Sequence, residues 1–542
     1  MIIYPERTWH RPDERVRIVL DGSPGDSWIR VHQGPWVVAE TAAQGGIVDL
    51  GVFAPGGYGV TLHTRRDTNE VQASTAFDVL SDAFERPRYG FVAGLDEKVD
   101  VESLQRFSRR MHLNLAQFYD WGYRHSRLMP PADDYVDPLG MPRSLTAVNR
   151  VADAYREAGT VPLGYSAVYA VGTDEVADWD DSVIRREDGE PYRLGENFLV
   201  LVDPGNSRWL AHYTEQLAEV IANTQLQGFH LDQYGWPKFA TTRTERVDLT
   251  KSFQTMLASV AAGVPDARIM FNNVNDFPTW ATANSPQDAT YIEVWSPHDT
   301  LQDLNDLVLR SRRLRPEHPP IISAYLSCLG NDIDGGVRAA RLTMASVFAA
   351  GGTHLLLGED GHALTDPYYP NNSVLPAPAV EQFASWYDFL VRYGDLLLPP
   401  GIEDVTEYYT GGINEDVVLD GGLSAPKAMP GQVWIRVMRL PDGGHVVHLV
   451  NLLGLDEIGW DAAKPLQEAV TGLALRLANG LVPAEAWWAS PDENASPMTA
   501  LRSEQSLAAA QSDSLSAGQE HLSFALPALR TWGLVWIPAA SS

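Results

Sequence analysis

Cysteine and long apolar runs are nearly missing from this chain of 542 residues. Its single cysteine, Cys328, excludes an intrachain disulfide and a cysteine-based metal site. No run of about 18 apolar residues is present, so the sequence predicts no membrane-spanning helix. Basic residues are few, 41 against 70 acidic ones, and the formal net charge of -29 disfavours nucleic acid and anionic membranes as partners.

Signals for export and for bound ions are missing as well. The N-terminal stretch MIIYPERTWHRPDERV lacks the apolar core of a signal peptide. We therefore expect a cytoplasmic protein, or a secreted one if an upstream signal has been removed. No calcium-binding loop signature occurs, and the stretch AAGG (349–352) precedes a predicted strand, so it does not form a phosphate-binding loop before a helix. We expect no cofactor and no metal, and the oligomeric state is left open.

Two common catalytic signatures are absent too. There is no GxSxG nucleophile elbow, which counts against acyl transfer by a serine triad. There is no HxH or HExxH spacing on the predicted strands, which counts against the usual zinc hydrolases. One metal-dependent alternative stays open, a hydrolase that binds its ion through Asp120, Asp232 and His354. Metal removal with a chelator would expose it.

What the chain does contain divides into three parts. Residues 1–84 hold short alternating runs separated by DGSPGD and APGG, which predict an antiparallel, immunoglobulin-like β-sandwich. Residues 85–400 alternate short apolar strands with amphipathic helices, the pattern of βα units. Residues 401–542 return to antiparallel strand patterns and predict a second sandwich. Within that part, residues 501–521 are interpreted as either a helix or a loop.

The central part contains eight candidate strands in about 310 residues. Helices with an apolar repeat of 3.6 residues separate most of them; one begins after Ser144 and ends near Gly159. Eight such units predict a (β/α)8 barrel of the TIM type, with one irregular unit between the fifth and sixth strands. The strands are expected at residues 88–94, 114–121, 162–170, 228–235, 267–274, 289–295, 320–326 and 353–359.

Carboxyl groups stand where several of these strands end. Asp232 closes the fourth strand in GFHLDQYG (228–235), and Glu293 closes the sixth. An acidic side chain costs several kcal/mol when it is buried without a partner, so a set of them at one rim calls for a reason. The active site of a barrel of this type lies at the carboxyl ends of its strands. Each residue alone could instead cap a helix or pair with a nearby arginine.

Glycoside hydrolysis is the chemistry that this rim suits best. It needs two carboxyl groups across the glycosidic bond, one of them kept protonated, together with aromatic and polar residues that contact sugar. The chain has 16 Trp, whose faces stack on sugar rings, although packing of large residues in cores accounts for about half of them. We therefore expect an oligosaccharide or polysaccharide partner.

Five stretches in the central part carry a family resemblance. They are QFYDWGYRH (117–125), GFHLDQYG (228–235), FNNVN (271–275), YIEVW (291–295) and FAAGGTHLLLGEDGHALTDPYYPN (348–371). In this order they resemble glycoside hydrolase family 66, which contains endo-dextranases and cycloisomaltooligosaccharide glucanotransferases. The match runs from about Arg86 to Leu398, and the flanking sandwiches suit the family's β-domains.

The resemblance implies roles for individual residues. Asp232 matches the family's nucleophile and Glu293 its acid/base, in a retaining attack on α-1,6-linked glucosyl units. For the remaining rim residues, the resemblance and their positions imply sugar contacts or support of catalysis. Arg124 could instead neutralise Asp120, and Asp299 could lie at a helix N-terminus. The expected substrate-binding set is Asp120, Trp121, Arg124, His125, Asn273, Trp295, Asp299, Glu359 and Asn371.

Departures from the family pattern bear on the reaction. The cyclising enzymes carry a carbohydrate-binding insertion near the seventh strand, whereas only residues 327–352 separate strands seven and eight here, which favours hydrolysis. FNNVN departs from the usual Asn-Ala-Val-Gly form, so subsite contacts are expected to differ. A transglycosylase, a hydrolase of a related α-glucoside and a catalytically silent sugar-binding protein stay open as alternatives.

Overall fold

The computed structural model describes residues 1–22, 25–66, 70–478, 481, 485–493, 497–506 and 521–539. At its centre is a sheet of eight parallel strands, and the spatial order of these strands follows the chain order. The strands are β8 (Tyr89–Val92), β9 (Leu115–Phe118), β12 (Val161–Ala167), β16 (Gly228–Asp232), β19 (Arg268–Asn272), β20 (Ala289–Glu293), β21 (Ile321–Ser323) and β22 (Thr353–His354). Seven of them fall within the predicted segments, and β12 begins one residue before its segment, which was expected at 162–170.

The two edges of this sheet meet, so the strands form a barrel. After β22 the chain continues into β23 (Leu357–Gly358), and the amide of Glu359 donates a hydrogen bond of 2.8 Å to the carbonyl of Phe91 in β8. A side chain at Gly358 would place its Cβ 2.3 Å from that carbonyl oxygen, so this close approach requires glycine. The predicted (β/α)8 barrel is thereby confirmed.

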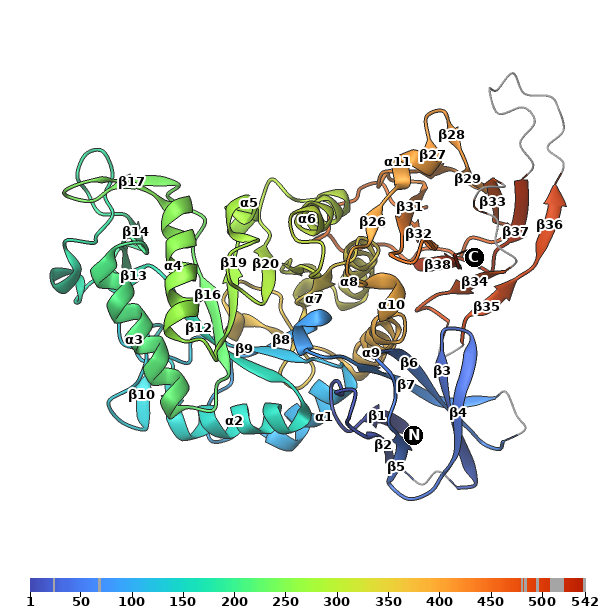
Figure 1. The fold of residues 1–542 in the computed structure, drawn as a ribbon, viewed down its shortest axis with the longest axis horizontal. Coiled ribbons are helices and arrows are strands. Elements are labelled where there is room, and N and C mark those ends of the chain that lie inside the picture. The colour runs from blue at the N-terminus through green and yellow to red at the C-terminus, as the bar shows by residue number, and fades with distance from the viewer. Residues whose placement is uncertain are drawn as a thin grey trace.

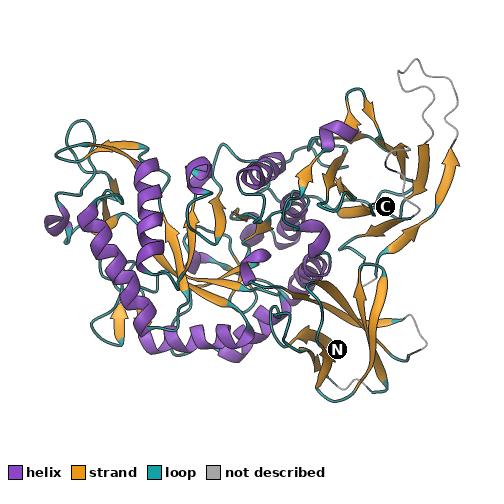
Figure 2. Cartoon of the chain, in the orientation of Figure 1, coloured by secondary structure: helices purple, strands orange, loops and turns teal. Residues whose placement is uncertain are grey.

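Helices surround the barrel strands (Figures 1 and 2). The Ser144 hydroxyl caps the second helix by accepting from the amide of Ala147, and Gly159 ends that helix in a left-handed conformation with φ 92°, as predicted. The unit between β19 and β20 holds only the four-residue α5 (Thr279–Thr282), which is the expected irregularity. The larger helices are α1 (Val101–Arg110), α2 (Leu145–Ala158), α3 (Ser207–Asn223), α4 (Leu249–Gly263), α6 (Leu301–Leu314), α8 (Ile333–Phe348) and α9 (Ala377–Arg392).

Alternation along each barrel strand decides which residues face the interior. In β16, Phe229 and Leu231 pack in the core shared with the outer helices. His230 points the opposite way and its ring lies 3.1 Å from the hydroxyl of Tyr89, inside the barrel. Residues two positions apart share a face, so Asp232 faces the same side as His230. The barrel interior contains several tyrosines, among them Tyr89, Tyr165, Tyr291 and Tyr369.

Small antiparallel sheets extend the loops that follow the barrel strands, and the sequence patterns did not predict them. A three-stranded sheet follows β12, hairpins follow β9 and β16, and a three-stranded sheet includes β23. Their strands are β10 (Asp134–Val136), β11 (Pro142–Ser144), β13 (Ala170–Gly172), β14 (Arg193–Leu194), β15 (Leu199–Leu201), β17 (Phe239–Thr241), β18 (Arg246–Asp248), β24 (His362–Ala363) and β25 (Ser373–Val374).

The N-terminal part folds into two antiparallel sheets that enclose one apolar core. Val16, Ile18, Ile29, Val31 and Val60 are fully buried there, at alternate positions of their strands. This is the predicted β-sandwich. One sheet contains β1 (Ile2–Pro5), β2 (Val16–Asp21) and β5 (Ile47–Gly51), and the other β4 (Trp36–Ala43), β3 (Ser27–Gln33), β6 (Gly56–His63) and β7 (Val71–Val79).

The C-terminal part likewise packs two sheets around a core of its own (Figure 1). The larger sheet contains β26 (Glu403–Asp404), β30 (Ser424–Ala425), β31 (Val433–Arg439), β32 (His445–Asn451), β38 (Trp532–Ile537), β34 (Ala486–Ala489) and β35 (Thr499–Leu501). The smaller contains β29 (Val417–Asp420), β33 (Ala474–Ala478), β37 (His521–Ala525) and β36 (Ser503–Ser506). In the segment 501–521, the described ends are strands and residues 507–520 lie outside the described part. That the domains end at residues 84 and 400 stays a prediction.

No helix in the described part of the chain is both long and apolar enough to cross a membrane.

Candidate active site

Two carboxyl groups meet at the carboxyl end of the barrel. Asp232 is the last residue of β16 and Glu293 the last residue of β20, with only β19 between them. One side-chain amide joins the pair: Nδ2 of Asn272, the last residue of β19, donates to Oδ1 of Asp232 and to Oε2 of Glu293, each over 2.7 Å. The two acceptor oxygens are therefore no more than twice that distance apart.

A tyrosine hydroxyl holds the other oxygen of each carboxyl group. Tyr165 on β12 donates to Oδ2 of Asp232 over 2.8 Å, and Tyr325, two residues after β21, donates to Oε1 of Glu293 over 2.9 Å. Each carboxyl group thus accepts one bond from the shared amide and one from its own tyrosine. Such bonds fix the orientation of both groups and stabilise their ionised forms.

Burial, in contrast, favours the protonated forms of the same two groups and raises their pKa values. Loss of hydration raises the pKa of Asp232 to about 6, although the bonds from Asn272 and Tyr165 lower it. Burial and then the nearby charge of Asp232 raise the pKa of Glu293 to about 7. Because the pKa of Asp232 is lower than that of Glu293, an ionised Asp232 beside a protonated Glu293 is favoured. A nucleophile and a general acid require this division of roles.

The pair opens into a cavity of about 490 Å³. Trp236 and Trp295 line it and are partly exposed, at 38% and 41%. Exposed tryptophan faces beside a carboxyl pair suit a ligand with apolar ring faces and polar edges, such as a sugar. The other lining residues are Leu194, Gln233, Tyr234, Gly235, Lys238, Val274, Asn275 and Phe277.

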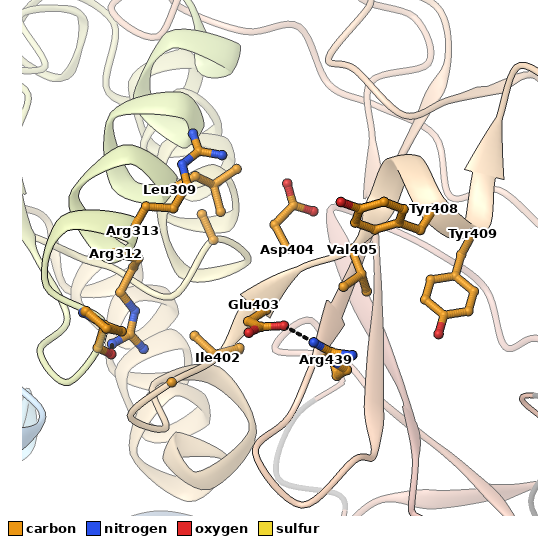
Figure 3. Close-up of a pocket in the computed structure, with 13 residues that line it drawn as sticks. Leu309, Arg312, Arg313, Ile402, Glu403, Asp404, Val405, Tyr408, Tyr409 and Arg439 are labelled. Atoms are coloured by element: carbon orange, nitrogen blue, oxygen red, sulfur yellow. Dashed lines mark hydrogen bonds and ion pairs between the residues drawn. The ribbon is translucent and has the colours of Figure 1, made fainter.

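A larger cavity of about 770 Å³ lies elsewhere, between α6 and the C-terminal sheet (Figure 3). Its walls include Arg312, Arg313 and Tyr408, and Glu403 on its wall is paired with Arg439. It is lined by the last turns of α6 and by Ala350, which precedes β22. It therefore lies toward the amino ends of the strands, away from Asp232 and Glu293.

Three expected rim residues take part in buried contacts of the protein itself. Trp121 is fully buried, and its ring N–H donates to the carbonyl of Tyr165 over 3.2 Å. Asn273 is fully buried and donates to the carbonyls of Phe271 and Tyr291. His125 is buried, and burial lowers its pKa to about 4. The expectation that Trp121 and Asn273 contact sugar is corrected, and Asn272 rather than Asn273 faces the site.

Because Trp121 is fully buried, we expect it to contribute to the stability of the protein. The tight packing involves Gly164, whose hypothetical Cβ would lie 2.6 Å from Nε1 of Trp121. Replacing Trp121 by alanine removes a large buried side chain and is expected to lower the free energy of unfolding by about 3–5 kcal/mol. Chemical denaturation of the variant measures this loss. A change below about 1 kcal/mol would contradict the role in packing.

Asp120 lies close to the pair, and its neighbouring cation is Arg143 rather than the expected Arg124. It is buried and adopts φ 41°, and burial followed by the charge of Asp137 raises its pKa to about 7, to which the charge of Asp232 also contributes. Arg143, which the sequence patterns missed, is the neighbouring cation: it donates to the Asp120 carbonyl over 3.3 Å and pairs with Asp137. Arg124 instead stacks on Tyr123 and donates to backbone carbonyls.

The remaining expected residues differ in how near they lie to the cavity. Trp295 lines it. The Glu359 carboxylate accepts from the backbone amides of Ala93 and Gly94, so it holds the barrel closure together. Asp299 is exposed and accepts from the Ser296 hydroxyl, one position before the residue that caps α6. Asn371 is exposed at the end of a short helical turn.

The metal-dependent alternative receives no support from these positions. His354 donates from Nε2 to the carbonyl of Ala324 over 3.1 Å within the barrel. In the described part of the chain, no group of three or more His, Cys, Asp or Glu side chains could hold a metal ion.

Paired carboxyl groups at this end of a barrel are the arrangement that glycosidic bond cleavage uses. A sequence model of glycosyl hydrolase family 66 matches residues 51–536, and the chain belongs to this family. The resemblance seen in the five stretches is thereby confirmed.

Similar proteins agree with this membership. A cycloisomaltooligosaccharide glucanotransferase from Niallia circulans is 20% identical over 86% of this chain, which spans 63% of that relative's length. A second relative of the same description and organism is 19% identical and is covered to 72%. The crystal structure of a Paenibacillus sp. cycloisomaltooligosaccharide glucanotransferase complexed with cycloisomaltoheptaose has a TM-score of 0.87 at 17% identity. It matches 98% of this chain and 99% of that chain, which shows a shared fold.

Proposed function

We propose that this protein is a retaining glycoside hydrolase that cleaves α-1,6-glucosidic linkages of isomaltooligosaccharides or dextran. Asp232 acts as the nucleophile and Glu293 as the acid/base. The observation that carries the proposal is the shared amide of Asn272, which brings one oxygen of each carboxyl group within 2.7 Å of a single nitrogen. Retaining enzymes hold their carboxyl groups about 5–5.5 Å apart, whereas inverting ones need about 6.5–9.5 Å.

The reaction has two displacements. In the first, a carboxylate oxygen of Asp232 attacks the anomeric carbon while Glu293 gives its proton to the departing glycosidic oxygen, leaving a β-linked glucosyl ester on Asp232. In the second, Glu293, now ionised, takes a proton from water, and the water oxygen attacks the same carbon. Asp232 departs as a carboxylate, the product has the α configuration, and Glu293 is protonated again.

Transglycosylation is the second candidate, because the two relatives and the similar crystal structure reported above are described as glucanotransferases. It uses the same glucosyl ester, with a sugar hydroxyl in place of water. Hydrolysis is favoured here by the short connection between β21 and β22, which consists of α7 (Cys328–Asn331) and α8. No domain-sized insertion fits between them.

The substrate class rests on family membership and on the cavity. An uncharged ligand suits the cavity, since its lining pairs two tryptophans with polar side chains and has one cation, Lys238, beside the carboxyl pair. The α-1,6 linkage is the part of the proposal that comes from the relatives rather than from the geometry.

Proton NMR of isomaltopentaose digestion tests the proposal directly. We expect the α-anomer of each new reducing end to appear first and mutarotation to follow. Initial formation of the β-anomer would refute the retaining mechanism. Longer or cyclic products would assign the protein to transglycosylation. If α-1,6-linked substrates stay intact while another α-glucoside is cleaved with retention, the substrate assignment is wrong and the assignment of the catalytic pair is kept.

A further inference from the structure

The loops after β20 and β21 both carry residues that touch Glu293 or its cavity, and one segment of the C-terminal part lies across both loops. This segment, residues 456–464, follows β32 and is called the strap here. The first loop presents Trp295 to the cavity, and the second presents Tyr325 to Glu293. The strap is thus the point where the C-terminal part reaches the surroundings of the acid/base.

The strap holds the first loop through backbone and ring contacts. Trp460 is 8% exposed, and its ring N–H donates to the carbonyl of His298 over 2.7 Å. The backbone amide of Trp460 donates to the carbonyl of Asp299 over 3.1 Å, and that of Leu301 donates to Ile458 over 2.9 Å. The loop after β20 and the start of α6 are therefore anchored to the strap.

The strap holds the second loop through one carboxylate. Oδ2 of Asp461 accepts from the Ser327 hydroxyl over 2.6 Å, and Oδ1 accepts from the backbone amide of Cys328 over 3.1 Å. These donors stand two and three residues after Tyr325. No other side chain in the described part of the chain is seen to accept from these two donors.

The strap is itself held in shape from within. Lys464 is 2% exposed, pairs with Glu457 and donates to the carbonyl of Gly459 over 2.5 Å. A buried lysine costs free energy unless it is paired, so its partners within the strap give the segment one conformation. Asp461 is thus presented by a preorganised support rather than by a free loop.

We propose that Asp461 is a positioning residue for the acid/base: it fixes the loop that carries Tyr325, and Tyr325 orients Glu293. This inference rests on the proposed function, since it assigns Asp461 to the protonation step. The physical reason is geometric. Proton transfer depends steeply on the placement of the acid, and a shift of about 1 Å costs up to about 10²-fold in rate.

A comparison of two substrates tests the role of Asp461. Protonation matters for isomaltopentaose, whose leaving group is a sugar hydroxyl, but little for a dinitrophenyl α-isomaltoside, whose phenolate leaves unaided. For Asp461→Ala, and more mildly for Ser327→Ala, we expect kcat/KM on isomaltopentaose to fall about tenfold, a fraction of the 10²–10⁴ that general acids contribute. On the aryl glycoside we expect a fall of less than about twofold.

The pH profile supplies a second readout. The bond from Tyr325 stabilises ionised Glu293 and lowers its pKa. Weakening that bond raises the pKa, so the basic limb of kcat/KM should move to higher pH in Asp461→Ala. Asp332→Ala is the matched control: its carboxylate accepts from the amide of Gly335 to cap α8, in the same region. Asp332 bonds the loop of Tyr325 through its backbone amide, which donates to the carbonyl of Cys328, and the substitution keeps this bond.

Equal losses on both substrates with an unmoved basic limb, or the same selectivity in Asp332→Ala, would overturn the inference. Ser327→Ala keeps the test meaningful if Asp461→Ala folds poorly. Glu293→Ala separates this inference from the proposed function. If Glu293→Ala itself fails to spare the aryl glycoside, the acid assignment is wrong. If Glu293→Ala keeps its activity on the aryl glycoside and Asp461→Ala does not, only the proposed role of Asp461 is refuted.

Discussion

Asp232→Ala is expected to lower kcat/KM on isomaltooligosaccharides by at least about 10⁴-fold. Losses of this size are typical when one residue of a catalytic group is removed. The physical reason is that no other group can form the glucosyl ester from the same face of the sugar. Asp232 is held in place by side-chain bonds from Tyr165 and Asn272, over 2.8 and 2.7 Å. Steady-state assays on isomaltopentaose, with a dinitrophenyl α-isomaltoside in parallel, measure the loss.

Rescue by azide shows that the lost group is the nucleophile. In Asp232→Ala, azide fits the space left by the carboxylate and attacks the anomeric carbon of the aryl glycoside, so we expect a β-glucosyl azide. Asp120→Ala is the matched control, because Asp120 is also a buried carboxyl group with a raised pKa near the pair. That variant should form no β-azide. A β-azide from Asp120→Ala alone would move the nucleophile to Asp120.

The melting temperature of Asp232→Ala shows whether the variant loses activity because it lacks the nucleophile or because it is unfolded. The pKa of Asp232 is raised in the folded protein, so this group favours folding at low pH and loses that contribution as the pH rises through about 6. Removing the carboxyl group therefore relieves a cost at pH 7, and the melting temperature of Asp232→Ala should not fall below that of the wild type.

The sequence patterns were sufficient for the fold because the barrel strands are continuous apolar runs. Strands buried on both faces carry few polar residues, so the runs stand out, and Ser144 and Gly159 mark a helix by local chemistry alone. The sheets in the loops, such as β13 with β15, are built from short strands of three residues each. Strands of this length are too short to show a repeating pattern of apolar residues in the sequence.

The choice between Asn272 and Asn273 shows where a one-residue uncertainty matters. Both end the fifth strand, but only Asn272 shares the inward face with Met270, which packs in the barrel interior. The register pairs Asn272 with Tyr291 of the next strand. Counting back from His230 and Asp232 on β16 gives the same alternation, so the signal was available in the sequence once the interior face was known.

Contacts across long sequence separations could not be predicted in this way. Trp121 follows Asp120, whose positive φ of 41° turns the chain and directs the tryptophan beneath the rim, toward Gly164. Asp461 lies more than 130 residues from Ser327, and their bond depends on how the C-terminal part packs on the barrel. Composition and period carry no information about either contact.

Asn272→Ala is the second variant for which we expect a large effect, a loss of about 10²–10³ in kcat/KM on isomaltooligosaccharides, comparable to the removal of one preorganised donor. The amide supplies a donor to each carboxyl group and keeps two acidic side chains at a fixed separation. Without it, repulsion moves the groups apart, and neither the attack nor the proton transfer retains its geometry.

The pH dependence of Asn272→Ala follows from the same bonds. Both donors stabilise ionised carboxylates and so lower the pKa values of Asp232 and Glu293. Their loss raises both, and the two limbs of the bell-shaped profile of kcat/KM should move to higher pH together, from about 6 and about 7 in the wild type. A shift of one limb alone would show that the amide serves one carboxyl group only.

Asn273→Ala is the control that the chain offers for this experiment. Its side chain bonds the carbonyls of Phe271 and Tyr291 and accepts from Thr282, all away from the pair. Its removal takes away these buried hydrogen bonds, although the Tyr291 carbonyl keeps the backbone amide of residue 273 as a donor. The loss should cost about 1–3 kcal/mol of stability, while the limbs of the pH profile stay in place. If the two variants behave alike, the inward assignment of Asn272 fails, and with it the observation that holds the carboxyl pair at the distance of a retaining enzyme.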